Sequence, residues 1–220
     1  MIKYEEELIK ILKVLDGSGL LTKSIITGSW AMYFYTEMFE NFEAPIATTD
    51  LDIFLPRVSN IKESNISKLI TDLNYVRDDD ILTGKTRYYS KDGFEIEFLT
   101  LPNRTLSNVI YIKSINIGAE ALPKLLPLTW NCISVHFYGY DVQIPSPTSY
   151  CLQKILINNE RNRDKQEKDI TAIRYLLGFI GSSKKYKEEF VELFNTYPKK
   201  WKKIILKTIE QYNLQTPIKK

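Results

Sequence analysis

The chain changes character at Pro145, and this change constrains the fold more than any other feature of its 220 residues. Before it, short apolar runs typical of strands alternate with segments of helical periodicity. After it, apolar residues recur at helical spacing in four successive segments. We therefore predict an α+β fold with two domains: a mixed sheet with flanking helices over residues 1–145, and a helical C-terminal domain over residues 146–220.

The two halves also differ in charge. Residues 1–145 contain 14 Lys and Arg against 19 Asp and Glu, whereas residues 146–220 contain 16 against 8. The small net charge of +3 is therefore a cancellation between an acidic half and a basic half. The basic half favours an anionic ligand, and the acidic half favours a cation.

Composition narrows the compartment and the kind of site. No apolar run approaches the roughly 20 residues of a membrane span, and charges interrupt the apolar positions of the N-terminal segment, unlike a signal peptide. Cys132, Cys151 and His136 are too few and too far apart for a structural zinc site, and we expect both thiols to be reduced. These features predict a cytoplasmic protein with no membrane partner.

The pattern predicts individual elements along the chain. The acidic run 77–80 lacks strand periodicity and is interpreted as a solvated loop, and residues 40–49, which include Pro45, are interpreted as another loop. Lys91-Asp92-Gly93 predicts a hairpin turn. Ser146 and Pro147 predict an N-cap and first helical residue. Helices are predicted at 3–15, 30–39, 61–73, 147–158, 164–180, 184–195 and 199–213, and strands at 24–27, 51–55, 75–76, 86–90, 94–100, 109–117, 132–138 and 141–144.

Acidic residues occur at alternating positions of two predicted strands. Asp50 and Asp52 share one face of their strand, as do Glu95 and Glu97, because side chains two residues apart point the same way. If the strands are neighbours, these carboxylates converge and repel one another unless a cation binds between them. Oxygen ligands suit Mg²⁺ or Mn²⁺. Taken alone, however, Asp50 and Asp52 are equally consistent with a turn cap and a solvent-facing edge strand.

Gly28-Ser29 connects a predicted buried strand to an apolar helix. Glycine lets a ligand approach the backbone closely, and we expect Ser29 to cap the helix. Free N–H groups in the first turn of a helix can bind phosphate. An ordinary strand–turn–helix connection explains the same residues.

The order of these features resembles the nucleotidyltransferase superfamily, whose fold is typified by polymerase β. The matching runs are ITGSWAMYFY, TTDLDIFLP and GFEIEFLTLP. The resemblance implies that Gly28 and Ser29 bind the triphosphate of a nucleoside triphosphate. It implies that Asp50, Asp52 and Glu97 are catalytic and hold two magnesium ions. The family usually has aspartate at the third position, so Glu97 is a departure.

The helical half resembles one branch of that superfamily, the bacterial AbiEii-type nucleotidyltransferases. The matching runs are PSPTSYCLQKILI, which contains Lys154, and RNRDKQEKDITAIRYLL, which contains Lys168 and Asp169. The resemblance implies that Lys154 neutralises the triphosphate, and that Lys168 and Asp169 complete the nucleotide-binding pocket. A toxin that acts on RNA and is partnered by an antitoxin protein is one function consistent with the resemblance, and an antibiotic-modifying or protein-modifying enzyme is another.

We therefore predict a metal-dependent transfer of a nucleoside monophosphate from a nucleoside triphosphate to RNA or tRNA, a protein or a small molecule. Eight lysines in residues 184–207 favour an RNA surface, although an amphipathic helix pair explains them equally well. A second hypothesis is a catalytically inactive module that uses the same fold for binding. Other enzyme classes with an Asp-x-Asp motif, phosphatases and glycosyltransferases, leave Gly28-Ser29 unexplained.

Overall fold

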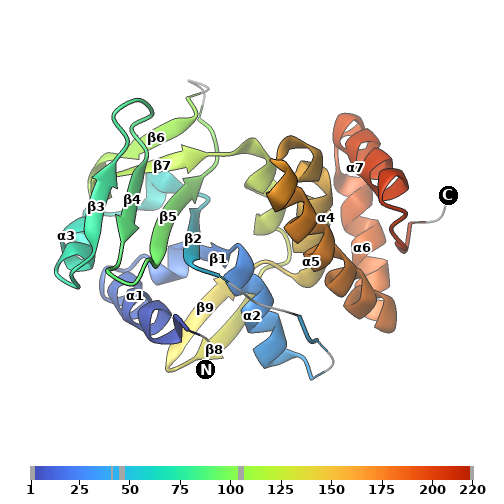
Figure 1. The fold of residues 1–220 in the computed structure, drawn as a ribbon, viewed down its shortest axis with the longest axis horizontal. Helices are drawn as coiled ribbons and strands as arrows, with labels where there is room; N and C mark the ends of the chain where they lie inside the picture. The colour runs from blue at the N-terminus through green and yellow to red at the C-terminus, as the bar shows by residue number, and fades with distance from the viewer. Residues whose placement is uncertain (1–2, 41, 45–47, 104–106, 219–220) are drawn as a thin grey trace.

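The computed structural model describes residues 3–40, 42–44, 48–103 and 107–218. Strands and helices are interspersed up to Ile144, and the elements that the structure describes after this residue are all helices (Figure 1). This is the α+β architecture expected from the sequence. Pro45 of the predicted loop lies outside the described residues. Within them, no helix is both long and apolar enough to cross a membrane.

A seven-stranded mixed sheet forms the first half of the chain, with the order β1-β2-β5-β4-β3 and the β6–β7 hairpin beside β5. The central strand β5 runs parallel to β2 along its whole length. On its other side β5 pairs first with β4, antiparallel, and then with β7, parallel. The strands are β1 (Ile25–Thr27), β2 (Asp50–Leu55), β3 (Val76–Asp79), β4 (Thr86–Tyr89), β5 (Glu95–Thr100), β6 (Val109–Ile112) and β7 (Ile117–Ala121).

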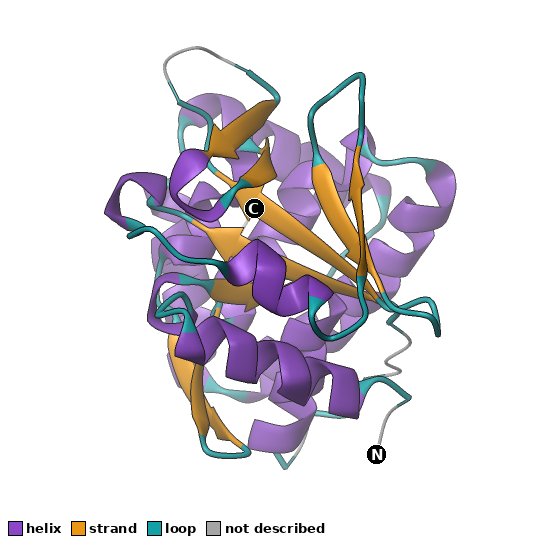
Figure 2. Cartoon of the chain, turned by 90° about the vertical axis from the view of Figure 1, so that its left-hand side faces the viewer, coloured by secondary structure: helices purple, strands orange, loops and turns teal. Residues whose placement is uncertain are grey.

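Helices and a small hairpin surround this sheet. Figure 2 shows the strands from the side opposite the four C-terminal helices. The helices of the first half are α1 (Glu5–Gly17), α2 (Ser29–Met38) and α3 (Ile66–Thr71), and the hairpin is β8 (Ile133–Phe137) with β9 (Tyr140–Ile144). The C-terminal helices are α4 (Pro147–Ile157), α5 (Arg163–Ser182), α6 (Lys184–Thr196) and α7 (Lys199–Gln211). Short 3₁₀ helices are η1 (Leu21–Lys23), η2 (Val58–Asn60), η3 (Lys113–Ile115), η4 (Pro123–Thr129) and η5 (Asn158–Glu160).

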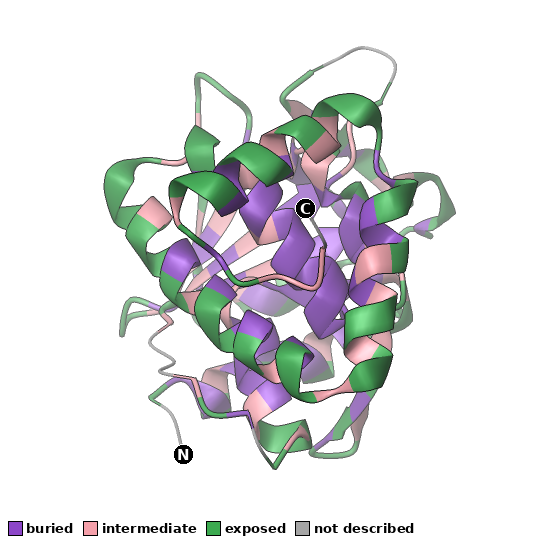
Figure 3. Ribbon diagram, turned by 90° about the vertical axis from the view of Figure 1, so that its right-hand side faces the viewer, coloured by how far each residue is buried: buried purple, intermediate pink, exposed green. Residues whose placement is uncertain are grey.

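Helix α4 is the centre of the helical half. It packs against α5, α6 and α7 and also against η4, which leads away from the sheet. As predicted, Ser146 caps it by accepting a hydrogen bond from the Ser149 amide, and Pro147 is its first residue. Buried residues of both halves belong to one apolar cluster. In Figure 3 the helices nearest the viewer are buried on their inner faces and exposed on their outer faces. The domain division at residue 145 stays a prediction.

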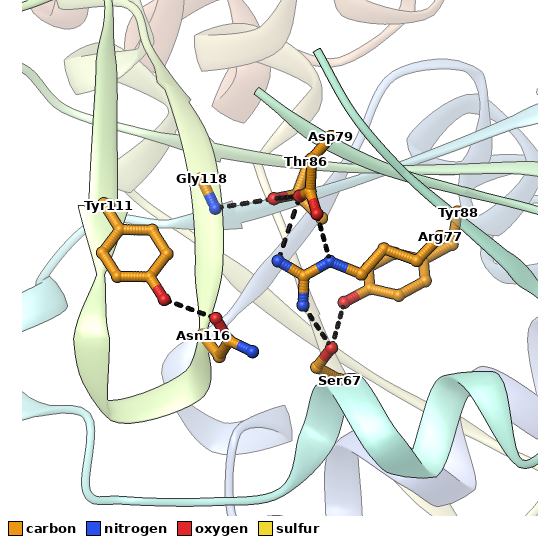
Figure 4. Close-up of polar contacts among 8 residues, drawn as sticks. All are labelled: Ser67, Arg77, Asp79, Thr86, Tyr88, Tyr111, Asn116 and Gly118. Atoms are coloured by element: carbon orange, nitrogen blue, oxygen red, sulfur yellow. Dashed lines mark hydrogen bonds and ion pairs between the residues drawn. The ribbon is translucent and has the colours of Figure 1, made fainter. Parts of the chain in front are cut away.

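The acidic run 77–80 corrects the sequence prediction, because Val76–Asp79 is strand β3 and not a loop. It is an edge strand that pairs only with β4, so three of its four residues are exposed and no burial periodicity marks it. Figure 4 shows what replaces burial: Arg77 forms an ion pair with Asp79 at 2.8 Å and donates to Ser67 Oγ at 2.6 Å. Polar contacts therefore order this strand.

Two other elements are shorter than their patterns indicate. The predicted helix 61–73 contains only α3, because residues 61–65 form no regular secondary structure and the Ser64 amide donates to the Ser114 carbonyl at 2.9 Å. The predicted strand 109–117 divides into β6, η3 and β7, where Asn116 takes a left-handed conformation with φ of 56°. Asn tolerates that conformation better than most residues, so an Asn within an apolar run was the available signal.

Candidate active site

A cavity of about 1420 Å³ lies between the sheet and helices α4 and α5. Every site residue predicted from the sequence lines it. The sheet side contributes Gly28, Ser29, Asp50, Asp52 and Glu97, and the helical side contributes Lys154, Lys168 and Asp169. Residues more than one hundred positions apart in the sequence therefore line the same cavity. Their roles stay predictions at this point.

The turn at Gly28 brings the start of α2 against the carboxylate of Asp52. Gly28 has φ of 66° and ψ of −151°, a conformation that side chains essentially exclude. A Cβ atom at this position would lie 2.1 Å from Asp52 Oδ2. Thr27, the last residue of β1, pairs directly with Asp52 in the sheet. Only glycine therefore allows the turn and the carboxylate to approach this closely.

The prediction that Ser29 caps α2 is wrong. The helix begins at Ser29 itself, the N-cap residue is Gly28, and no side chain caps this end. The reason is the positive φ of Gly28, which turns the chain into the helix one residue earlier than a serine cap would. The uncapped N–H groups of the first turn are the donors that can bind an anion, as the phosphate hypothesis requires.

The register of β2 and β5 places the four predicted acids side by side. Asp50 pairs with Glu95, and Asp52 pairs with Glu97. Burial, together with the negative charges of Asp50 and Glu97, raises the pKa of Asp52 to about 7. Asp50 is exposed at the strand start, where it accepts a hydrogen bond from Thr48 Oγ1 at 3.0 Å. The cavity thus has an acidic wall with Asp52 as its most perturbed member.

Glu97 has cationic partners of its own. Its Oε1 atom accepts from Arg87 Nε at 2.7 Å and lies 2.9 Å from Lys85 Nζ. Burial disfavours the charge of Glu97, but Lys85 and Arg87 outweigh it and hold its pKa below the ordinary value. Within the described residues, no three Asp, Glu, His or Cys side chains form a group that could hold a metal ion. Glu97 is thus neutralised by cations of the protein in this state.

Asp50 and Asp52 fit a divalent cation. Among the described residues, neither of them forms an ion pair with a basic side chain. Burial, together with the charges of Asp50 and Glu97, raises the pKa of Asp52 although Arg161 and Lys154 partly oppose the rise. A cation bound there would relieve that repulsion, and carboxylate oxygens are what Mg²⁺ and Mn²⁺ prefer. Glu97 fits such an ion only if its bonds to Lys85 and Arg87 rearrange.

The helical wall is held together by one buried acid. Asp169, only 3% exposed, forms an ion pair with Lys154 at 2.6 Å and another with Arg161 at 3.2 Å. Burial opposes the charge of Lys154, but Tyr150 and Asp169 outweigh it and raise its pKa. Lys168 is exposed at the same cavity. The structure therefore brings the three predicted helical residues together.

Tyr150 links the helical wall to the glycine turn. Its hydroxyl donates to the Gly28 carbonyl at 2.6 Å, and Lys154 lies 4.9 Å from the centre of its ring. Sequence reasoning missed Tyr150, although it precedes Lys154 by four residues and so shares its helix face. It also missed Arg161, Lys85 and Arg87, whose importance depends on partners distant in the chain.

The lysine-rich segment does not contribute to the cavity. Its eight lysines lie on α6 and α7, and none of them lines the cavity. The basic side chains that do line it come from elsewhere: Lys3, Lys124, Lys154, Arg161, Lys165 and Lys168. An RNA surface on α6 and α7 stays a prediction that the cavity does not support.

Comparison with known proteins places the chain in a family. A family model described as Nucleotidyltransferase matches residues 6–191, and no curated protein matches. ANT(2")-Ia in complex with adenylyl-2"-tobramycin has 13% identity and a TM-score of 0.51 over 94% of this chain and 97% of that one. A solution structure of the same resistance factor has 13% identity and a TM-score of 0.49 over 94% of this chain and 91% of that one. A nucleotidyltransferase-like protein from Paracoccidioides brasiliensis has 15% identity and a TM-score of 0.48 over 91% of each chain.

The structural likeness at 13% identity shows the fold alone, whereas the family match covers most of the chain. That match begins in α1 and ends in α6, so it includes both walls of the cavity. The chain belongs to this nucleotidyltransferase family and is an enzyme of the nucleotidyl-transferring class.

Proposed function

We propose that the cavity transfers a nucleoside monophosphate from a nucleoside triphosphate to an acceptor hydroxyl, with Mg²⁺ or Mn²⁺ as cofactor. The single observation that carries this proposal is the arrangement of charge in one cavity: Asp50 and Asp52 on the sheet side, Lys154 and Lys168 on the helical side. A metal–triphosphate complex has the complementary arrangement, with a cation to face the carboxylates and a polyanion to face the lysines. The Gly28 turn on the sheet side contacts Tyr150 of the helical wall and offers backbone donors at the start of α2.

In this mechanism the N-terminus of α2 binds the phosphates, and Lys154 and Lys168 neutralise those that leave. Asp50 and Asp52 would hold the divalent cation, joined by Glu97 once its bonds to Lys85 and Arg87 rearrange, and the cation would supply charge stabilisation at the reacting phosphorus. Asp169 orients Lys154 through their 2.6 Å ion pair. The acceptor hydroxyl gives its proton to solvent water as its oxygen forms a bond to the α-phosphorus. The bond from that phosphorus to the bridging oxygen breaks, and pyrophosphate leaves with the electron pair of that bond.

The direct test is transfer of label. The protein is incubated with α-³²P-labelled ATP, GTP, CTP or UTP, MgCl₂ or MnCl₂, and separate pools of cellular RNA, protein and small molecules. The proposal expects labelled product in one pool, release of pyrophosphate, and loss of both on adding a chelator. Nucleotide binding without divalent cation and without transfer would instead identify a binding module.

The same three pools identify the class of acceptor and test the proposed AbiEii-type toxin role. Label in RNA, with growth arrest on expression of the wild-type chain, is the outcome expected of such a toxin, and co-purification of a small neutralising protein is expected of its antitoxin. Label in a small molecule resembles the adenylylated tobramycin bound by the structural neighbour. Label found only in protein would exclude both the toxin role on RNA and the modification of a small molecule.

Tyr150→Phe should weaken nucleoside triphosphate binding about fivefold. The phenol hydroxyl is the atom that bonds the Gly28 carbonyl, and a buried hydrogen bond contributes about 1 kcal/mol. The matched control is Tyr35→Phe, which removes an equally buried hydroxyl from the Pro145 carbonyl at 2.7 Å. Calorimetry and thermal unfolding should show similar losses of stability but weaker nucleotide binding only for Tyr150→Phe. Equal affinities in the two variants would contradict the link.

A further inference from the structure

Two cations of the sheet converge on one oxygen of Glu97. Arg87 Nε and Lys85 Nζ lie 2.7 and 2.9 Å from Oε1, and Lys85 is only 7% exposed. Each cation also has a second acidic partner, Glu95 for Arg87 at 3.2 Å and Glu120 for Lys85 at 2.5 Å. The cations therefore lie within a ladder of alternating charges and not at a free surface.

This ladder stands where the third metal ligand is expected. Glu97 lines the cavity and pairs in register with Asp52, yet its charge is already compensated. A divalent cation approaching it would meet two positive groups within hydrogen-bond distance of the same carboxylate. The glutamate, one bond longer than the aspartate usual in the family, can reach these cations as well as the cavity.

We propose that Lys85 and Arg87 are positioning residues that hold Glu97 and weaken the binding of a free divalent cation to the carboxylates. The cation then enters together with the nucleoside triphosphate, because the phosphates supply negative charge in place of the Glu97 charge that Lys85 and Arg87 neutralise. This inference rests on the proposed function, because it assigns the cavity to a metal–nucleotide complex. It concerns the order of binding and not the chemical step.

The test compares two arginines of neighbouring strands. Arg87→Met removes one cation from Glu97, whereas Arg77→Met removes an arginine of similar exposure whose 2.8 Å ion pair is with Asp79, outside the cavity. Arg87→Met should bind MnCl₂ alone about tenfold more tightly than wild type, as expected for removing one positive charge a few ångströms from a divalent ion in water. Arg77→Met should match wild type. Lys85→Met should also bind MnCl₂ more tightly than wild type, as Arg87→Met does.

Calorimetry with MnCl₂ alone, then with MnCl₂ and ATP, distinguishes the outcomes. Unchanged or weaker Mn²⁺ binding by a folded Arg87→Met overturns this inference, even where Mn²⁺–ATP binding by wild type upholds the proposed function. No Mn²⁺-dependent ATP binding by wild type overturns the proposed function and the inference with it. If Lys85→Met does not fold, Arg87→Met still decides, because its side chain is more exposed.

Discussion

Replacing Asp52 with asparagine should lower the rate of nucleotide transfer by about 10³-fold or more. The side chain keeps its shape and loses the charge of a cavity carboxylate that forms no ion pair with any of the described basic side chains. Metal stabilisation of a reacting phosphoryl group is worth several kcal/mol, and each 1.36 kcal/mol is tenfold in rate. Because burial and neighbouring acids raise the pKa of Asp52 to about 7, the neutral amide should not destabilise the fold at pH 8.

Asp141→Asn is the control for this change. Asp141 is also a strand carboxylate, on β9, but its side chain is 76% exposed and it does not line the cavity. Its transfer rate should stay within twofold of wild type. Label transfer at saturating nucleoside triphosphate is the measurement, with thermal unfolding recorded for both variants. A folded Asp52→Asn variant that retains more than a tenth of the wild-type rate would refute the assignment of Asp52.

The elements of the site were predictable because each depends on local pattern. The alternation of Asp50 and Asp52 with apolar residues indicated a strand face, and Gly28 indicated a tight turn before a helix. The helical half followed from periodicity and from the Ser146-Pro147 cap. The hairpin turn Lys91-Asp92-Gly93 joins β4 to β5 as predicted, and Gly93 has the positive φ that such a turn favours.

The partners across the cavity were not predictable in the same way. The pairing of Arg87 with Glu97 depends on strand register, which the predicted hairpin suggests. The contact of Lys85 with Glu97 is not suggested in this way, because Lys85 lies before the start of β4. Tyr150 meets Gly28 only because the helical half folds back over the sheet, 122 residues along the chain. Long-range contacts of this kind leave no periodic signal, since neither residue changes the pattern of its own segment.

Replacing Gly28 with alanine should lower both the stability of the protein and the rate of nucleotide transfer. The added Cβ would lie 2.1 Å from Asp52 Oδ2, far inside van der Waals contact, so either the turn or the carboxylate must move. The backbone conformation alone costs an alanine about 1–3 kcal/mol. Displacement of a reacting group by about 1 Å can cost about 10²-fold in rate, and here the triphosphate turn and Asp52 shift together.

Gly19→Ala separates strain from displacement, because Gly19 has φ of 69° and nothing lies within 4 Å of its added Cβ. It should lose about 1–2 kcal/mol of unfolding free energy and keep its transfer rate. Gly28→Ala should lose more stability and, among the molecules that stay folded, at least about 10²-fold in rate. Chemical unfolding and label transfer measure the two effects independently. Equal behaviour of the two variants would mean that the contact between an added Cβ at position 28 and Asp52 Oδ2 has no effect of its own on the rate.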